Sequence, residues 1–83
     1  MTERFVVPVR LFGRHRELAG AAELSVELAV GGTVGDVKQA LAAHPGLSGP
    51  QSFAIAVNRR YEPDESPVTE GDEVAVIPPV AGG

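Results

Sequence analysis

The side chains of this 83-residue sequence that could do chemistry are few, and their spacing fits no catalytic or metal site. His15 lies between Arg14 and Arg16, a setting that disfavours metal binding and protonation, and we expect a solvated loop histidine there. His44 has no second histidine or carboxylate at ligand spacing, so a cap or surface position is expected. No serine stands in the G-x-S-x-G setting of a nucleophile elbow. The sequence therefore predicts neither a catalytic side chain nor a bound metal.

Two further patterns have a structural interpretation. The run Gly31-Gly32-Thr33-Val34-Gly35 superficially suggests a phosphate-binding loop, but it lacks the Lys and Ser/Thr of a Walker sequence. Glu62, Asp64 and Glu65 could bind a hard cation, yet they fit no calcium-loop spacing, and we expect a solvated acidic loop. Because the sequence contains no cysteine, a disulfide framework and a thiolate nucleophile are excluded.

The last six residues, Pro78-Pro79-Val80-Ala81-Gly82-Gly83, carry the chemistry that remains. Neither proline can donate to a sheet ladder, so a strand ends before them and a stiff, polyproline-like stalk is expected. Gly82 and Gly83 have no Cβ atoms and suit a narrow slot in another protein. A frayed chain end is the alternative. The residues that we expect to insert into a partner are Pro79, Val80, Ala81 and Gly82.

The reactive group of this tail is the α-carboxylate of Gly83. A carboxylate is ionised at neutral pH and is a poor acyl electrophile, so it must be activated before it can react. Activation by ATP to an acyl-adenylate is the expected route, and the sequence shows no ATP site. We therefore expect that a partner enzyme binds ATP-Mg and that this chain binds no cofactor. The domain is expected to be the part that partner proteins bind in order to reach Gly83.

Size and composition predict one small domain over residues 1–77, followed by a flexible tail over residues 78–83. With 43% hydrophobic and 22% charged residues, the chain is globular rather than disordered. The net charge of −4 argues against nucleic acid as a partner. No apolar run approaches membrane-spanning length and no signal peptide precedes the body, so we expect a cytoplasmic protein without membrane contact.

Hydrophobic periodicity and turn residues predict several strands and one main helix. Thr33 is the expected N-cap of the helix, and Asp36, three residues on, completes a variant of the capping box. Pro45-Gly46 ends the helix. The other predicted elements are strands at Phe5–Phe12, Glu23–Val30, Phe53–Val57 and Glu73–Ile77, a stub strand at Val68–Thr69, a turn or one helical loop at Arg14–Ala19, a loop at Leu47–Gln51, and an irregular stretch at Tyr61–Pro67.

This order of elements predicts an α+β fold of the β-grasp (ubiquitin-like) type, a mixed sheet of about five strands with one main helix packed on one face. Pro8 conflicts with the first strand, because proline removes a ladder bond and usually marks an edge or a bulge. The side chains predicted to face the core are Phe5, Val7, Val9 and Leu11 of the first strand and Leu24, Val26, Leu28 and Val30 of the second.

Strand parity places large apolar side chains on the face that the helix leaves uncovered. Phe12 is opposite the core set of its strand, Ile77 is opposite Val74 and Val76, and Tyr61 follows the third strand just beyond its turn. If the final strand runs beside the first, these side chains converge near the base of the tail. We therefore predict that Phe12, Tyr61 and Ile77 form a partner-docking patch, with scattered surface residues as the alternative.

Four blocks of the sequence resemble the MoaD family, the ubiquitin-like small subunits of molybdopterin synthase. The blocks are residues 9–20 (VRLFGRHRELAG), 32–37 (GTVGDV), 56–58 (AVN) and 70–83 (EGDEVAVIPPVAGG), so the resemblance spans nearly the whole chain. The C-terminal block is the most specific of the four. The sequence departs from the family at Arg59-Arg60, where relatives often carry other polar residues, and at Pro8 in the first strand.

The resemblance implies a sulfur carrier that is not catalytic alone. An adenylating enzyme related to ubiquitin-activating enzymes would use ATP-Mg to form an adenylate at Gly83, and a sulfur donor would convert it to a thiocarboxylate. The tail would then enter the active site of the large subunit of molybdopterin synthase, within a heterotetramer, and donate sulfur to cyclic pyranopterin monophosphate in molybdenum cofactor biosynthesis. The dithiolene needs two sulfurs, so loading would be repeated.

Other functions remain open from the sequence. One alternative is a sulfur carrier for another pathway, such as thiamin, cysteine or tRNA thiolation. Another alternative is a protein-conjugating modifier. A function of a different class is a plain β-grasp interaction module, which would act through its sheet face with the tail incidental.

Overall fold

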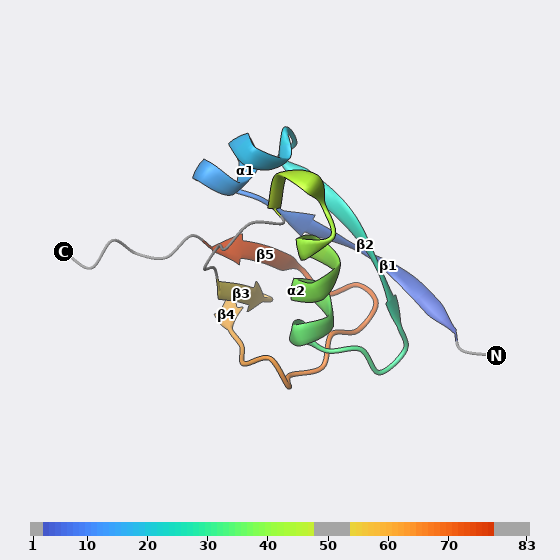
Figure 1. The fold of residues 1–83 in the computed structure, drawn as a ribbon. Coiled ribbons are helices and arrows are strands. Elements are labelled where there is room, and N and C mark those ends of the chain that lie inside the picture. Colours follow the sequence, from blue (N-terminus) through green and yellow to red (C-terminus); the bar gives the residue numbers. More distant parts are fainter. Residues whose placement is uncertain (1–2, 48–53, 78–83) are drawn as a thin grey trace.

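The computed structural model describes residues 3–47 and 54–77 (Figure 1). The predicted tail, residues 78–83, lies outside the described residues, and so does Phe53. The elements in chain order are β1 (Arg4–Arg10), α1 (Gly13–Ala19), β2 (Glu23–Ala29), α2 (Val34–Ala42), the short 3₁₀ helix η1 (Pro45–Leu47), β3 (Ala54–Val57), β4 (Arg60–Tyr61) and β5 (Val74–Ile77).

The described strands form one five-stranded sheet in the order β2-β1-β5-β3-β4. The sheet is mixed, because β1 pairs antiparallel with β2 and parallel with β5. β3 pairs antiparallel with both β5 and β4. Helix α2 lies across one face of this sheet (Figure 1). The arrangement confirms the predicted β-grasp fold, and it places the final strand beside the first.

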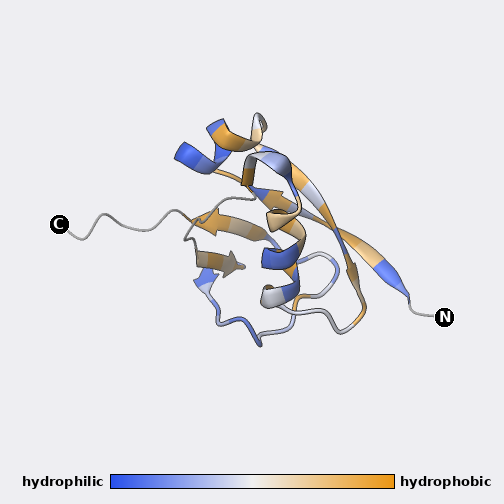
Figure 2. Ribbon diagram, viewed as in Figure 1, coloured by the Kyte–Doolittle hydropathy of each residue, from blue (hydrophilic) through white to orange (hydrophobic). Residues whose placement is uncertain are grey.

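The hydrophobic core lies between α2 and the sheet. Alternate residues of β1 are buried, so its helix-facing side is apolar while its other side is exposed. Figure 2 shows β5 and most of β1 as hydrophobic, and β4 and the loop that follows it as mainly hydrophilic. Full burial of one Val or Leu side chain stabilises the fold by about 1.5–3 kcal/mol. The most deeply buried large side chains are Leu11, Leu41, Ile55, Val7, Val9, Val34, Val37, Val68, Val74 and Val76.

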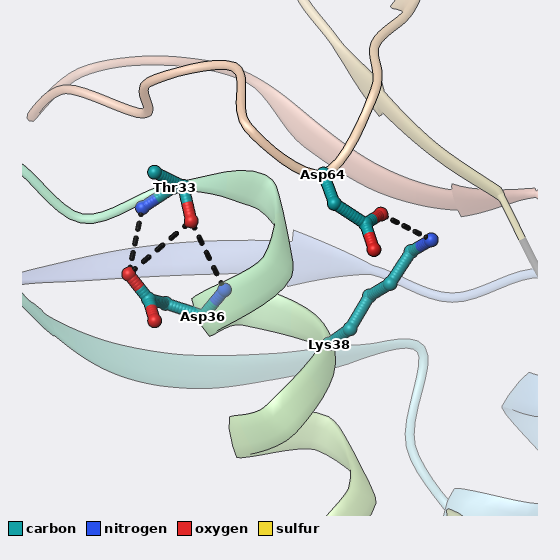
Figure 3. Close-up of polar contacts among 4 residues, drawn as sticks. All are labelled: Thr33, Asp36, Lys38 and Asp64. Atoms are coloured by element: carbon teal, nitrogen blue, oxygen red, sulfur yellow. Dashed lines mark hydrogen bonds and ion pairs between the residues drawn. The ribbon is translucent and has the colours of Figure 1, made fainter.

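The first turn of α2 is capped as the local sequence predicts. The Thr33 hydroxyl oxygen accepts a hydrogen bond from the Asp36 backbone N–H at 3.4 Å (Figure 3). The Asp36 carboxylate in turn accepts one from the Thr33 backbone N–H at 2.9 Å. These two bonds form the predicted capping box and satisfy two donors that a helix start leaves without intrahelical partners.

The loop between β4 and β5 satisfies further donors of the same helix start. The Val34 N–H donates to the Ser66 carbonyl and the Gly35 N–H to the Asp64 carbonyl, each at 2.9 Å. Lys38 Nζ adds an ion pair with Asp64 at 2.7 Å (Figure 3). Anion sites at helix starts need free N–H groups, and here these groups have partners. The glycine-rich run is therefore a strand-to-helix junction, as expected.

Pro8 lies within β1 without breaking it. On the β2 side of the strand, the Leu11 N–H donates to the Ala22 carbonyl at 2.8 Å. Backbone groups alternate along a strand, so the Pro8 nitrogen faces the opposite side, toward β5. The pairing with β5 covers Val9 and Arg10, which places Pro8 just before it begins. The missing N–H is thus accommodated at a locally unpaired edge, one of the two settings that the sequence predicts.

Several expected positions are wrong because the elements end earlier or pack differently. Alternation predicts that Val30 faces the core, but β2 ends at Ala29 and Val30 is 62% exposed in the turn that follows. The short fourth strand is Arg60–Tyr61, which begins one residue before the stretch expected to be irregular and includes its first residue. Val68 is buried without belonging to a strand. Leu47, expected in a loop, is buried in η1.

His15 also corrects the sequence-based expectation. It lies in α1, a seven-residue helix that packs against η1, and only 3% of the residue is exposed. Burial, together with the charge of neighbouring Arg14, holds the pKa of His15 below its ordinary value of 6.5. The flanking arginines already indicated that protonation is disfavoured. Helix α1 packs against η1, a contact between distant segments that local residue spacing does not reveal.

The lowered pKa of His15 predicts a pH-dependent stability. The unfolded chain binds the proton more readily than the folded one, so this contribution to stability is complete above about pH 6.5 and is lost as pH falls through the folded pKa. Urea unfolding between about pH 7.5 and pH 5 should therefore show a steeper loss of unfolding free energy in the wild type than in His15→Gln. Equal slopes for the two proteins would contradict this role of His15.

Candidate functional site

A row of side chains crosses the helix-free face of the sheet and forms the floor of a shallow hollow. Ala75 of β5 is paired with Arg10 of β1 on one side and with Ala56 of β3 on the other. Ala56 is paired in turn with Tyr61 of β4. Two small side chains therefore occupy the middle of the row, and long ones stand at its ends. This size difference explains why the sheet face is hollowed there.

The hollow has a volume of about 320 Å³ and brings together the three predicted docking residues. Phe12 is 44% exposed and Tyr61 is 67% exposed, while Ile77 is half-buried at the end of β5. The predicted strand parity of Phe12 and Ile77 is confirmed, because Leu11 and Val76 beside them are buried. The complete lining is Arg10, Phe12, Ala56, Arg59, Tyr61, Glu73, Ala75 and Ile77. Binding of a partner at this hollow stays a prediction.

Charged side chains surround the apolar floor. Arg10 and Arg59 supply two positive charges, and Glu73 supplies one negative charge. Arg59 Nε lies 3.6 Å from Glu73 Oε2 in an exposed ion pair. An exposed pair of this kind contributes at most about 1 kcal/mol to stability, so its charges remain available to a docking protein. The hollow thus combines apolar surface with a positively charged rim.

The turn beside the hollow is fastened to the start of β5. The Asn58 backbone N–H donates to the Glu73 carbonyl at 2.7 Å, and the Asn58 side-chain oxygen accepts from the Glu73 N–H at 3.0 Å. The Asn58 side-chain amide also donates to Asp72 at 3.1 Å. The Thr69 backbone N–H donates to the same carboxylate and is the main cause of the lowered pKa of Asp72. These contacts fix one wall of the hollow.

The remaining candidates from the sequence do not assemble into a chemical site. Within residues 3–47 and 54–77, no group of three His, Cys, Asp or Glu residues could hold a metal ion. Of the acidic loop, Asp64 pairs with Lys38, Glu62 accepts a hydrogen bond from the Ser66 hydroxyl at 3.4 Å, and Glu65 is exposed. No helix in the described part of the chain is long and apolar enough to cross a membrane.

Ile77 lines the hollow and is the residue directly before the predicted tail in the sequence. The residues predicted to insert and react, Pro79 to Gly83, lie outside the described part of the chain, so their roles stay predictions. Ile77, the last described residue of β5, lines the hollow. A protein that binds the hollow would therefore contact the chain one residue before the tail begins. This proximity is the geometric link between the docking patch and Gly83.

Sequence reasoning missed both the floor and the charged rim of the hollow. Ala56 and Ala75 stand in register only because β5 lies between β1 and β3, and that order was not part of the residue pattern. The signal available was the alternation of small and large residues in the third strand. In the sequence Arg59 stands out only as a departure from the family, because its place at the hollow depends on the hairpin between β3 and β4.

Two relatives match this chain over nearly its whole length. The chain is 38% identical over 81 residues to a protein of Chlamydomonas reinhardtii named molybdopterin synthase sulfur carrier subunit, covering 93% of this chain and 98% of the relative. It is 33% identical over 84 residues to an Arabidopsis thaliana protein of the same name, covering 99% of this chain and 88% of the relative.

Solved structures share the fold. SAMP1 from Haloferax volcanii matches with a TM-score of 0.83 and 29% identity, covering 95% of this chain and 100% of that one. A chain from a complex of subunits 1 and 2 of the Helicobacter pylori molybdopterin-converting factor matches with a TM-score of 0.68 and 25% identity, covering 95% and 100%. The ThiS family model matches residues 9–83, which include both the hollow and the Gly-Gly end. The chain therefore belongs to the ThiS family.

Proposed function

We propose that this chain is the sulfur-carrier subunit of a molybdopterin synthase and that Gly83 carries the sulfur. The observation that carries the proposal is the hollow at the end of β5, which residues 78–81 separate in sequence from Gly82-Gly83, in a chain whose relatives over nearly the full length bear that name. The Helicobacter pylori structure, a complex of subunits 1 and 2, supports a second subunit as the partner, and the proposal places its docking site at the hollow.

Loading of Gly83 requires activation by another enzyme. In the proposed first step, a carboxylate oxygen of Gly83 attacks the α-phosphorus of ATP, held with Mg²⁺ by an adenylating enzyme, and pyrophosphate leaves. A sulfur nucleophile then attacks the acyl carbon, AMP leaves, and a thiocarboxylate forms. This chain contributes the substrate carboxylate and a docking surface, because the lining of the hollow contains no arrangement of nucleophile and base.

The loaded tail then serves the synthase. Gly82 and Gly83 would enter a narrow active site of the large subunit, within a heterotetramer. The thiocarboxylate sulfur would attack a carbon of cyclic pyranopterin monophosphate and displace an oxygen substituent, which forms a thioester. Water would then hydrolyse the acyl–sulfur bond, leaving the sulfur on the pterin and the carboxylate on Gly83. The spent carboxylate returns to the adenylating enzyme for the next sulfur. Both partners must reach the same tail, so the hollow beside Ile77 is the surface on which each is expected to dock.

Mass spectrometry of the intact chain tests the proposal. After incubation with the cognate adenylating enzyme, ATP, Mg²⁺ and a hydrosulfide source, we expect a mass increase equal to the replacement of one oxygen by sulfur. Fragmentation should place the change on Gly83. Omission of ATP is the control, because the carboxylate is unreactive without activation. An unchanged mass in the complete mixture would overturn the sulfur-carrier function.

A second candidate is a protein modifier, and the similarity to SAMP1 favours it, since a related structure is named small archaeal modifier protein 1. A modifier would form an isopeptide bond between Gly83 and a lysine of another protein. Recovery of such adducts from cells would support this candidate, whereas capture of the large synthase subunit would support the sulfur carrier. A carrier for a thiamin, cysteine or tRNA thiolation pathway would instead be captured with enzymes of that pathway.

A further inference from the structure

The two-residue turn between β3 and β4 contains a strained arginine. Val57 pairs with Arg60, so Asn58 and Arg59 alone form the turn. Their φ angles are 52° and 68°, both in the left-handed region. Positive φ at both central residues is the type I′ pattern, in which asparagine suits the first position and glycine the second. Arg59 therefore holds a backbone conformation that a glycine would adopt without strain.

The surrounding contacts keep this turn in place. Asn58 makes three hydrogen bonds to the start of β5, two with the Glu73 backbone and one with the Asp72 carboxylate. The turn is thus fixed on both sides, by the β3–β4 pairing and by β5. Backbone strain that the surrounding structure maintains is concentrated at functional positions in proteins. The side chain at this position is the feature that requires an explanation.

The Arg59 side chain is available to a partner at the rim of the hollow. It is 87% exposed, and its Nε lies 3.6 Å from the Glu73 carboxylate. A guanidinium has five N–H donors in a planar fork, and one distant carboxylate does not use them. Arg10 adds a second positive charge beside the same apolar floor. The rim is therefore positive on a chain whose net charge is −4.

The next residue in the chain provides a contrast. Arg60 lines a different hollow, together with Val57, Glu62, Ser66 and other residues of the loop before β5. Arg59 and Arg60 carry the same charge and are neighbours in sequence, but they belong to different surfaces. A general need for positive charge at this hairpin would be met by Arg60 alone. Of these two arginines, only Arg59 lines the hollow beside Ile77.

We propose that Arg59 is a specificity-determining residue that pairs with a carboxylate of the large synthase subunit. The partner segment is expected to place an apolar side chain over Ala56 and Ala75, with an Asp or Glu beside it that reaches Arg59. Docking would remove water from the rim and strengthen this charge-assisted hydrogen bond. The inference rests on the proposed function, because that function supplies the partner.

Binding measurements with the purified large subunit test the inference. Arg59→Glu is expected to weaken binding by about tenfold or more, because it places like charges together. Arg59→Gly should also weaken binding while the free domain becomes at least as stable, since glycine relieves the turn. Raising the salt concentration should weaken wild-type binding more than Arg59→Glu binding. Arg60→Glu is the matched control and should change the affinity by less than about threefold.

The outcomes distinguish a failure of the inference about Arg59 from a failure of the proposed function. If the wild type binds and both Arg59 variants bind equally well, Arg59 has no role in recognition and the inference is overturned while the proposed function stands. If Arg60→Glu weakens binding as much as Arg59→Glu, general charge accounts for the effect, and the inference is again overturned. If the wild type itself does not bind the large subunit, the proposed function fails and the inference fails with it.

Discussion

A chain that lacks Gly82 and Gly83 is expected to remain folded and to lose sulfur loading completely. The core side chains of residues 3–47 and 54–77 all lie at or before Val76, so we expect the deletion to leave that core intact. The shortened chain ends in Ala81, whose carboxylate would stop short of the adenylating site by two residues, about 7 Å of extended chain. Intact mass after the loading reaction, together with urea unfolding, gives both readouts.

A second variant separates the position of the carboxylate from the loss of residues. Addition of one alanine after Gly83 keeps every native residue but moves the terminal carboxylate and adds a Cβ atom. We expect this variant to fold normally and to resist loading as well, because the proposed slot accommodates only glycine at its end. If the shortened chain supports synthase activity as the wild type does, the tail is incidental and the chain acts as a plain interaction module.

The parts of the fold that were predictable from sequence are those governed by local rules. The capping box of Thr33 and Asp36 depends on residues three apart, and it forms as expected. The alternation in β1 gives the correct buried face because a strand has a fixed period of two. Val30 shows the limit of this rule, since alternation does not reveal where a strand ends, and Gly31 with φ 91° turns the chain there.

The errors arise where distant segments decide the environment. His15 is buried in α1, a helix that packs against η1 about thirty residues later in the chain. The short strand at Arg60–Tyr61 was missed because its turn contains Arg59 where glycine is the usual signal. At the site, strand parity predicts the exposed face of Phe12 and Ile77. The position of Ala56 and Ala75 on the floor of the hollow follows only from the strand order.

Truncation of Phe12 and Ile77 is expected to weaken binding of the large synthase subunit with the fold retained. Both side chains line the hollow, and truncation of a central anchor at an interface typically costs more than about 1 kcal/mol. Phe12 is the N-cap residue of α1, but its side chain makes no capping hydrogen bond, so Phe12→Ala leaves the helix start intact. The double variant should lose on the order of a hundredfold in affinity.

The control for this prediction is Val6→Ala. Val6 is 56% exposed on the helix-free face of β1, but it does not line the hollow. Val6→Ala therefore removes exposed apolar surface from the same face of the sheet outside the hollow. Calorimetric titration of the large subunit should give unchanged affinity for Val6→Ala and reduced affinity for each hollow variant. Urea unfolding should show that both variants remain folded and that truncation of the half-buried Ile77 lowers the free energy of unfolding more than Phe12→Ala does. Wild-type affinity in both hollow variants would show that the partner docks on another surface of the domain.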